Sequence, residues 1–244
     1  MNITKEMKMA DVIFFNFQLL PVITRFGIRL GFGERSVLEV CREYNVNLEF
    51  FIEITNSFID DEYIPQTALT SFPINLIVDY LHKTHDYYMQ EKIPEIETMI
   101  HEMVNCKGGE KHKRQLLENF FSEYKKELTN HINREEEVVQ PYVLEIEKAF
   151  FNKKLSKELY LKIKKYSIED FAGEHDNVEE KLNDLKNIII KYLPPCGNPS
   201  LCNKILTELF RLEKDLNAHA RLEDKVLIPK VARIEKLLLE NYLA

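Results

Sequence analysis

Glycine and proline are scarce in this chain, with 7 and 9 copies among 244 residues. They supply the tight turns of folds built from many short strands, so their scarcity argues against a turn-rich all-β fold. An apolar run long enough to span a bilayer is also missing, and no small-residue cleavage site follows the N-terminal MNITKEMKMADVIFF. We therefore expect neither a membrane span nor a signal peptide, and a cytoplasmic location. Leu, Glu, Lys and Ile dominate instead, which favours helices.

Positive charge is not in excess, because the formal net charge is -7. This balance argues against binding to nucleic-acid phosphates or to an anionic membrane surface. Hydrophobic residues make up 45% and charged residues 30%, as in ordinary globular proteins. The length allows one sizeable core and a small appendage.

Cysteine is limited to four copies, Cys41, Cys106, Cys196 and Cys202, and no two form Cys-x2-Cys. The Cys196–Cys202 spacing is a poor match to a zinc knuckle. We expect free thiols in a reducing compartment. A redox role for Cys196 and Cys202 is the alternative.

Hydrophobic periodicity divides the chain into a small N-terminal part and a long helical part. The N-terminal part is expected to hold a helix over 9–25 interrupted at Pro21, a helix over 35–44, and a helix capped by Asn47. A linker is expected over 60–73. The remainder predicts four long helices and one short helix, at 73–104, 110–151, 167–192 and 199–243, and at 156–166.

Four long helices joined by modest loops predict an all-α protein with an antiparallel four-helix bundle. We assign residues 1–62 to a small helical domain and residues 70–244 to the bundle. The N-terminal helical unit could support a homodimer.

The bundle contains one motif twice. Residues 131–143 read HINREEEVVQPYV and residues 219–231 read HARLEDKVLIPKV. A His and a Glu four residues apart share one face of a helix, and both residue types bind metals. A single copy is commonly a solvated or ion-paired surface feature, but the repeat predicts two halves of one metal site.

The other two helices offer partners. His85 precedes His131 by nearly the distance that separates His175 from His219. The nearby His82 is an alternative to His85, while His101, His112, Glu136, Glu137 and Asp224 are expected at the surface or around the site. The predicted metal ligands are His85, His131, Glu135, His175, His219 and Glu223.

Four imidazoles and two carboxylates suit a di-iron centre, with Glu135 and Glu223 as bridges between two non-haem iron ions. Six protein ligands leave positions for an oxo or hydroxo bridge and for a small ligand such as NO, O2 or peroxide. Zinc or manganese could occupy the same ligands. Val138 and Val226 are expected in the core below the site, and Pro141 and Pro229 to kink the helices or cap the site. Tyr88 is expected to be a core tyrosine.

The stretches HDYYMQEKIPEI, NHINREEEVVQPYV, EHDNVEEKL and AHARLEDKVLIPKV resemble hemerythrin-like (HHE cation-binding) domains over about residues 73–233. More narrowly, they are similar to the di-iron family for iron–sulfur cluster repair. Residues 9–58 also resemble the small N-terminal domain of that family. The family's loop carries adjacent cysteines, whereas this chain has Leu30-Gly31-Phe32-Gly33. A role that depends on those thiols therefore loses its support.

The resemblance implies a di-iron protein of nitrosative or oxidative stress, which protects or repairs iron–sulfur proteins and binds NO or O2. An alternative is a sensor that signals O2, NO or redox state to a protein partner. A ferritin-like oxidase is disfavoured by the His-rich ligand set. The sequence leaves open whether the protein is an enzyme.

Overall fold

The structure is a computed structural model, and it describes residues 2–63, 72–105, 111–173, 178–193 and 198–242. Within these ranges every regular element is a helix, and Lys8 and Ser36 form an isolated β-bridge. The prediction of an all-α protein is confirmed. No helix in the described part of the chain combines the length and the apolar character needed to cross a bilayer.

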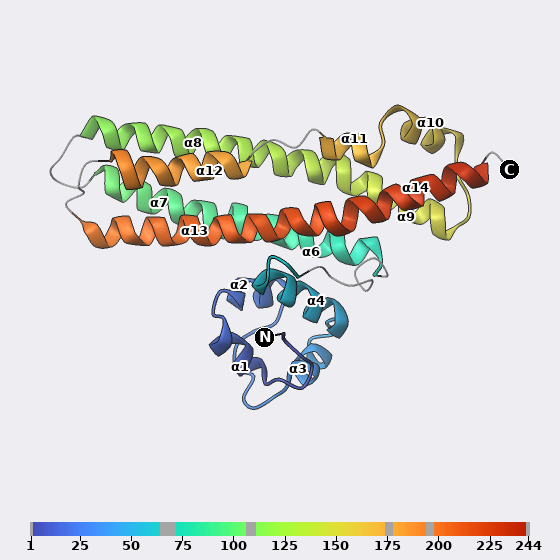
Figure 1. Cartoon of the computed structure of the whole chain (residues 1–244), viewed down its shortest axis with the longest axis horizontal. Coiled ribbons are helices and arrows are strands. Elements are labelled where there is room, and N and C mark those ends of the chain that lie inside the picture. The colour runs from blue at the N-terminus through green and yellow to red at the C-terminus, as the bar shows by residue number, and fades with distance from the viewer. Residues whose placement is uncertain (1, 64–71, 106–110, 174–177, 194–197, 243–244) are drawn as a thin grey trace. The chain divides into compact units, whose positions relative to one another are not determined.

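Four short helices form the N-terminal region (Figure 1). The predicted 9–25 helix is two helices, and the break falls at Asn16, whose side chain accepts a hydrogen bond from the Gln18 N–H (3.0 Å). Pro21 lies in the first turn of the second helix, where its missing N–H is tolerated. The bounds are α1 Met9–Phe15, α2 Leu19–Arg25, α3 Val37–Glu43 and α4 Leu48–Ile59.

Side-chain caps fix where these helices begin. Ser36 and Glu39 form a reciprocal capping box at α3. Asn47 caps α4, because its Oδ1 accepts from the Phe50 N–H (3.0 Å), so the predicted cap is confirmed. Both caps satisfy backbone donors that the first helical turn leaves without an internal partner.

Four longer helical segments and one short helix, α10, follow (Figure 1). Most contain a five-residue π-helical turn, labelled η, and continue through it. Their bounds lie close to the predicted ranges, except that the predicted 167–192 helix is described as α11 and α12, and residues 174–177 lie outside the described residues. The elements are α6 Ile74–Tyr87, η1 Tyr88–Lys92 and α7 Ile93–Val104; α8 Lys111–Arg134, η2 Glu135–Val139 and α9 Gln140–Phe151; α10 Lys157–Lys165; α11 Ile168–Gly173, α12 Val178–Asn187 and η3 Ile188–Tyr192; α13 Pro199–Leu222, η4 Glu223–Leu227 and α14 Ile228–Tyr242.

In η1, η2 and η4 the π-helical turn is followed two residues later by a proline inside the helix. Proline lacks an N–H and its ring clashes with the carbonyl four residues earlier. In η2 the residue before Pro141 donates its N–H five residues back, from Gln140 to Glu135. Ile228, before Pro229, does the same to Glu223 in η4. The helices therefore accommodate these prolines by a local π-helical turn and continue beyond it.

Packing divides the chain into two compact units, Met1–Thr84 with Ala218–Lys230, and His85–Asn217 with Val231–Ala244. Packing and independent folding are different properties, so the domains predicted at 1–62 and 70–244 stay a prediction. In the first unit, aromatic rings join the N-terminal helices to α6. Phe26 and Phe50 contact Tyr80 with ring centroids 5.2 and 6.0 Å apart.

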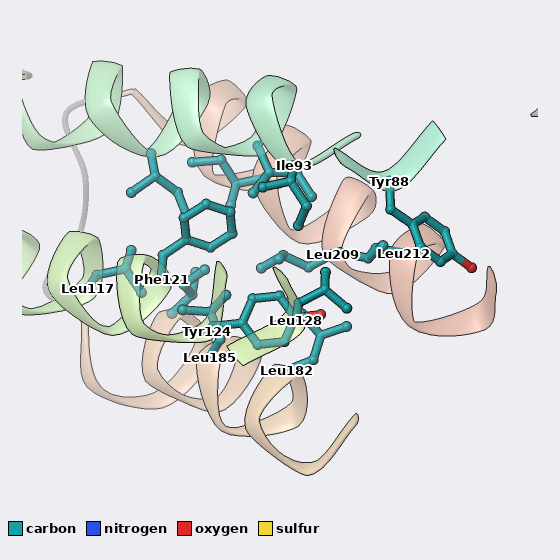
Figure 2. Close-up of a cluster of buried hydrophobic side chains, with 14 of the residues drawn as sticks. Tyr88, Ile93, Leu117, Phe121, Tyr124, Leu128, Leu182, Leu185, Leu209 and Leu212 are labelled. Carbon is teal, nitrogen blue, oxygen red and sulfur yellow. The ribbon is translucent and has the colours of Figure 1, made fainter. Parts of the chain in front are cut away.

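The core of the second unit is formed by side chains from α7, α8, α12 and α13, with Tyr88 of η1 and Ile189 of η3, as expected for a four-helix bundle. Figure 2 shows aromatic and leucine side chains from these helices meeting in one cluster. Burying each such side chain contributes about 1.5–3 kcal/mol. The labelled members are Tyr88, Ile93, Leu117, Phe121, Tyr124, Leu128, Leu182, Leu185, Leu209 and Leu212.

Candidate metal centre

The two copies of the His-x3-Glu motif have the same local structure. In each, the His lies in the last turn of an α-helix and the Glu is the first residue of a π-helical turn. His131 Nε2 lies 3.0 Å from Glu135 Oε1, and His219 Nε2 lies 3.4 Å from Glu223 Oε1. The helical spacing therefore places both groups of each motif on one face, as the sequence indicated.

His85, at the end of α6, approaches the first motif. Its Nε2 lies 3.1 Å from Glu135 Oε2, and its side chain is 2% exposed. Glu135 thus directs one carboxylate oxygen toward His85 and the other toward His131. One carboxylate shared by two imidazoles is an arrangement that a metal centre of mixed nitrogen and oxygen donors can use.

Four of the six predicted ligands form a buried cluster. Each of them offers one ligand atom, and these atoms lie within 4.8 Å of one another. Ligand atoms on opposite sides of a transition metal are about 4–4.4 Å apart, because metal–ligand bonds measure roughly 2.0–2.2 Å. The cluster is therefore close to the size that surrounds a single cation, and it contains His85, Glu135, His219 and Glu223.

The cluster is buried, and burial determines what its carboxylates require. Two carboxylates removed from water are unfavourable unless cations or hydrogen-bond donors compensate them. Neutral imidazoles add nitrogen donors that suit iron, zinc or copper, and carboxylate oxygens suit harder ions. The donor set therefore fits a divalent transition metal.

The remaining histidines have different positions. His131 is beside the cluster, and its side chain is 19% exposed. The predicted ligand His175 lies outside the described residues, so its assignment stays a prediction. The alternative ligand His82 is exposed, as are His101 and His112, whereas His85 is buried.

Two contacts around the cluster could not be assigned from sequence alone. Glu136 Oε1 lies 3.0 Å from His85 Nδ1. Tyr88 is buried, as expected, and its hydroxyl donates to Asp215 Oδ1 (3.1 Å). Tyr88 follows His85 by about one helical turn and Asp215 precedes His219 by one, so spacing was the available signal.

The expectation for the two repeat valines is half wrong. Val226 is 3% exposed, but Val138 is 46% exposed. A residue seven positions on returns to the same face only in a regular α-helix, and each valine lies in a π-helical turn. Val226 also belongs to the segment that packs in the first unit, whereas Val138 belongs to the second.

Comparison with known proteins agrees with this geometry. The sequence profile described as hemerythrin HHE cation binding domain matches residues 76–231. The chain is 22% identical over 204 residues to the iron-sulfur cluster repair protein YtfE of Yersinia pseudotuberculosis (strain IP 31758), covering 83% of this chain and 86% of that protein. YtfE of Yersinia pestis shows the same identity and coverage.

Proposed function

Because this chain belongs to the hemerythrin HHE cation-binding family, we propose that its bundle holds two non-haem iron ions. The proposed ligands are His85, His131, Glu135, His175, His219 and Glu223. The observation that carries the proposal is the buried cluster of two imidazoles and two carboxylates, which joins both copies of the repeated motif.

The ligand types support iron over a structural zinc site. Structural zinc sites are closed, tetrahedral and usually rich in cysteine, whereas the described cluster contains only imidazole and carboxylate donors. Glu135 already faces two imidazoles, which supports a bridging role for its carboxylate. When bound, a di-iron centre with open coordination positions would supply reversible binding of NO or O2.

The protein's own residues contribute burial and orientation. His85, Glu135, His219 and Glu223 are each less than 9% exposed, so bulk water has little access to them. The aliphatic and aromatic core of the bundle holds the helices that carry them. The site would thus limit contact between bulk water and the bound metals.

The proposed biological role is protection or repair of iron–sulfur centres under nitrosative or oxidative stress. It is supported by the likeness to YtfE, whose name states iron–sulfur cluster repair. The loop 30–33 of this chain contains no cysteine, so the role is assigned to the bundle and not to thiols of the N-terminal region.

The test is anaerobic purification, metal analysis, and absorption spectra recorded before and after addition of NO and O2. We expect about two irons per chain, and spectra that change with each gas. His219→Ala with Glu223→Ala should remove at least one metal, whereas the exposed His101→Ala should keep both. Trace iron in protein reconstituted with ferrous iron would refute the proposal.

A second candidate function is a sensor, favoured by contacts of the second motif within the first unit. Arg221, between His219 and Glu223 in sequence, binds Asp61 Oδ1 (2.8 Å) and the Ser57 carbonyl (3.1 Å). A change at the motif could therefore reach the end of α4.

Hydrogen exchange of metal-free and iron-loaded protein tests the sensor function. We expect protection around Ser57 to differ between the two states, and Arg221→Ala to abolish the difference. Equal protection in both states would contradict sensing by this route.

A further inference from the structure

Both ring nitrogens of His85 face carboxylates of consecutive residues of one helix. Its Nε2 lies 3.1 Å from Glu135 Oε2, and its Nδ1 lies 3.0 Å from Glu136 Oε1. Neighbouring residues of a regular α-helix do not face the same partner. Here Glu135 and Glu136 open the π-helical turn η2, and both reach the same imidazole.

The two contacts have different consequences for metal binding. A histidine that binds a metal through one nitrogen carries its proton on the other, and that N–H needs an acceptor when the ring is buried. An ionised carboxylate can only accept hydrogen bonds. Glu136 is therefore suited to hold the Nδ1–H of His85, which leaves Nε2 to face the cluster.

The second copy of the motif differs at this position. Asp224 aligns with Glu136 in the repeat but has a side chain shorter by one methylene. Asp224 is exposed, whereas the Glu136 side chain is 29% exposed. Glu137, the next residue of η2, is also exposed and carries the same carboxylate, so it provides a matched control within the same helix.

We propose that Glu136 is a positioning residue for the metal centre, acting through His85. It fixes the ring orientation and the tautomer in which Nε2 is the ligand atom. This inference rests on the proposed metal-binding function, and it concerns the first half of the repeat.

The test compares wild type, Glu136→Gln and Glu137→Gln. Glutamine keeps the shape of Glu136 but removes its charge. Ferrous iron affinity is measured by competition with a chelator, after each metal-free protein is shown to melt like wild type. We expect Glu136→Gln to lower the affinity for the more strongly affected iron by about 10–100-fold. This is the range typical when a ligand histidine loses its hydrogen-bond partner. Glu137→Gln should bind like wild type.

Two further readouts separate positioning from general structure. In zinc-loaded protein, the long-range ¹H–¹⁵N spectrum should show His85 protonated at Nδ1, with a shifted or lost signal in Glu136→Gln. In a His85→Ala background, Glu136→Gln should cause no further loss of affinity. If metal-free Glu136→Gln melts well below wild type, Glu136→Asp takes its place in the same comparison.

The outcomes distinguish the inference from the proposal beneath it. If wild type binds no metal, the metal-binding function itself fails. If wild type binds iron and Glu136→Gln matches it in affinity and in the His85 signal, only the role of Glu136 is overturned. The same holds if Glu136→Gln weakens binding equally with and without His85.

Discussion

The buried hydrogen bond between Tyr88 and Asp215 gives a quantitative prediction for the bundle. Tyr88 is 1% exposed and Asp215 is 6% exposed, and the two oxygens are 3.1 Å apart. A hydrogen bond to a charged group contributes roughly 1.5–3 kcal/mol, and burial prevents water from replacing the lost donor. Tyr88→Phe should therefore lower the free energy of unfolding by about 1.5–3 kcal/mol. For a chain of this size the melting temperature should fall by about 3–12 °C.

The assay is urea and thermal denaturation of the metal-free protein, which removes any contribution of bound iron. Tyr242→Phe is the matched control, because Tyr242 is 43% exposed and the change should stay within about 0.5 kcal/mol. In an Asp215→Ala background the effect of Tyr88→Phe should shrink, since the acceptor is gone. The reasoning is refuted if Tyr88→Phe changes stability no more than Tyr242→Phe, or equally in both backgrounds.

Two other predictions concern packing and pH. Leu209→Ala, at a 0% exposed position, should destabilise the protein by about 2–5 kcal/mol in urea denaturation, whereas Ile190→Ala, at a 57% exposed position, should change it by less than about 0.5 kcal/mol. Burial raises the pKa of Glu235 above its ordinary value of 4.5, although hydrogen bonds from Tyr142 and the Ile168 N–H oppose the shift. A raised folded-state pKa means that stability is lost as pH rises from the ordinary value through the folded one. Glu235→Gln should therefore stabilise the protein at neutral pH relative to wild type, and a difference that does not grow with pH in denaturation series would contradict this.

Local sequence features predicted the helices well. The hydrophobic periodicity of each long helix lies within its own sequence, and caps such as Asn47 act within one turn. Ser167 was likewise predicted to begin a helix, and its Oγ accepts from the Asp170 N–H (3.4 Å) at α11. Features of this kind are local in sequence, so they can be read without knowing how the helices pack.

The π-helical turns explain where local reasoning fell short. The prolines signalled a disturbance, but a kink and a π-helical turn both relieve the missing N–H. The difference matters because the turn changes which residues share a face. Val138 is exposed and Glu136 reaches His85, although regular 3.6-residue periodicity indicates neither position.

The candidate site was likewise predictable only where its contacts are local in sequence. The pairs His131–Glu135 and His219–Glu223 follow from i, i+4 spacing within one helix. The choice of His85 over His82 depends on how the first helix is rotated toward its neighbours. A single sequence does not determine this rotation. The contact of Glu136 with His85 depends on that rotation as well.

The central claim is tested most directly by titrating ferrous iron into the metal-free protein under anaerobic conditions. The account predicts saturation at about two irons per chain for wild type, and loss of at least one in the His219→Ala, Glu223→Ala double variant. Saturation that is unchanged in the double variant, or no binding to wild type, would contradict it.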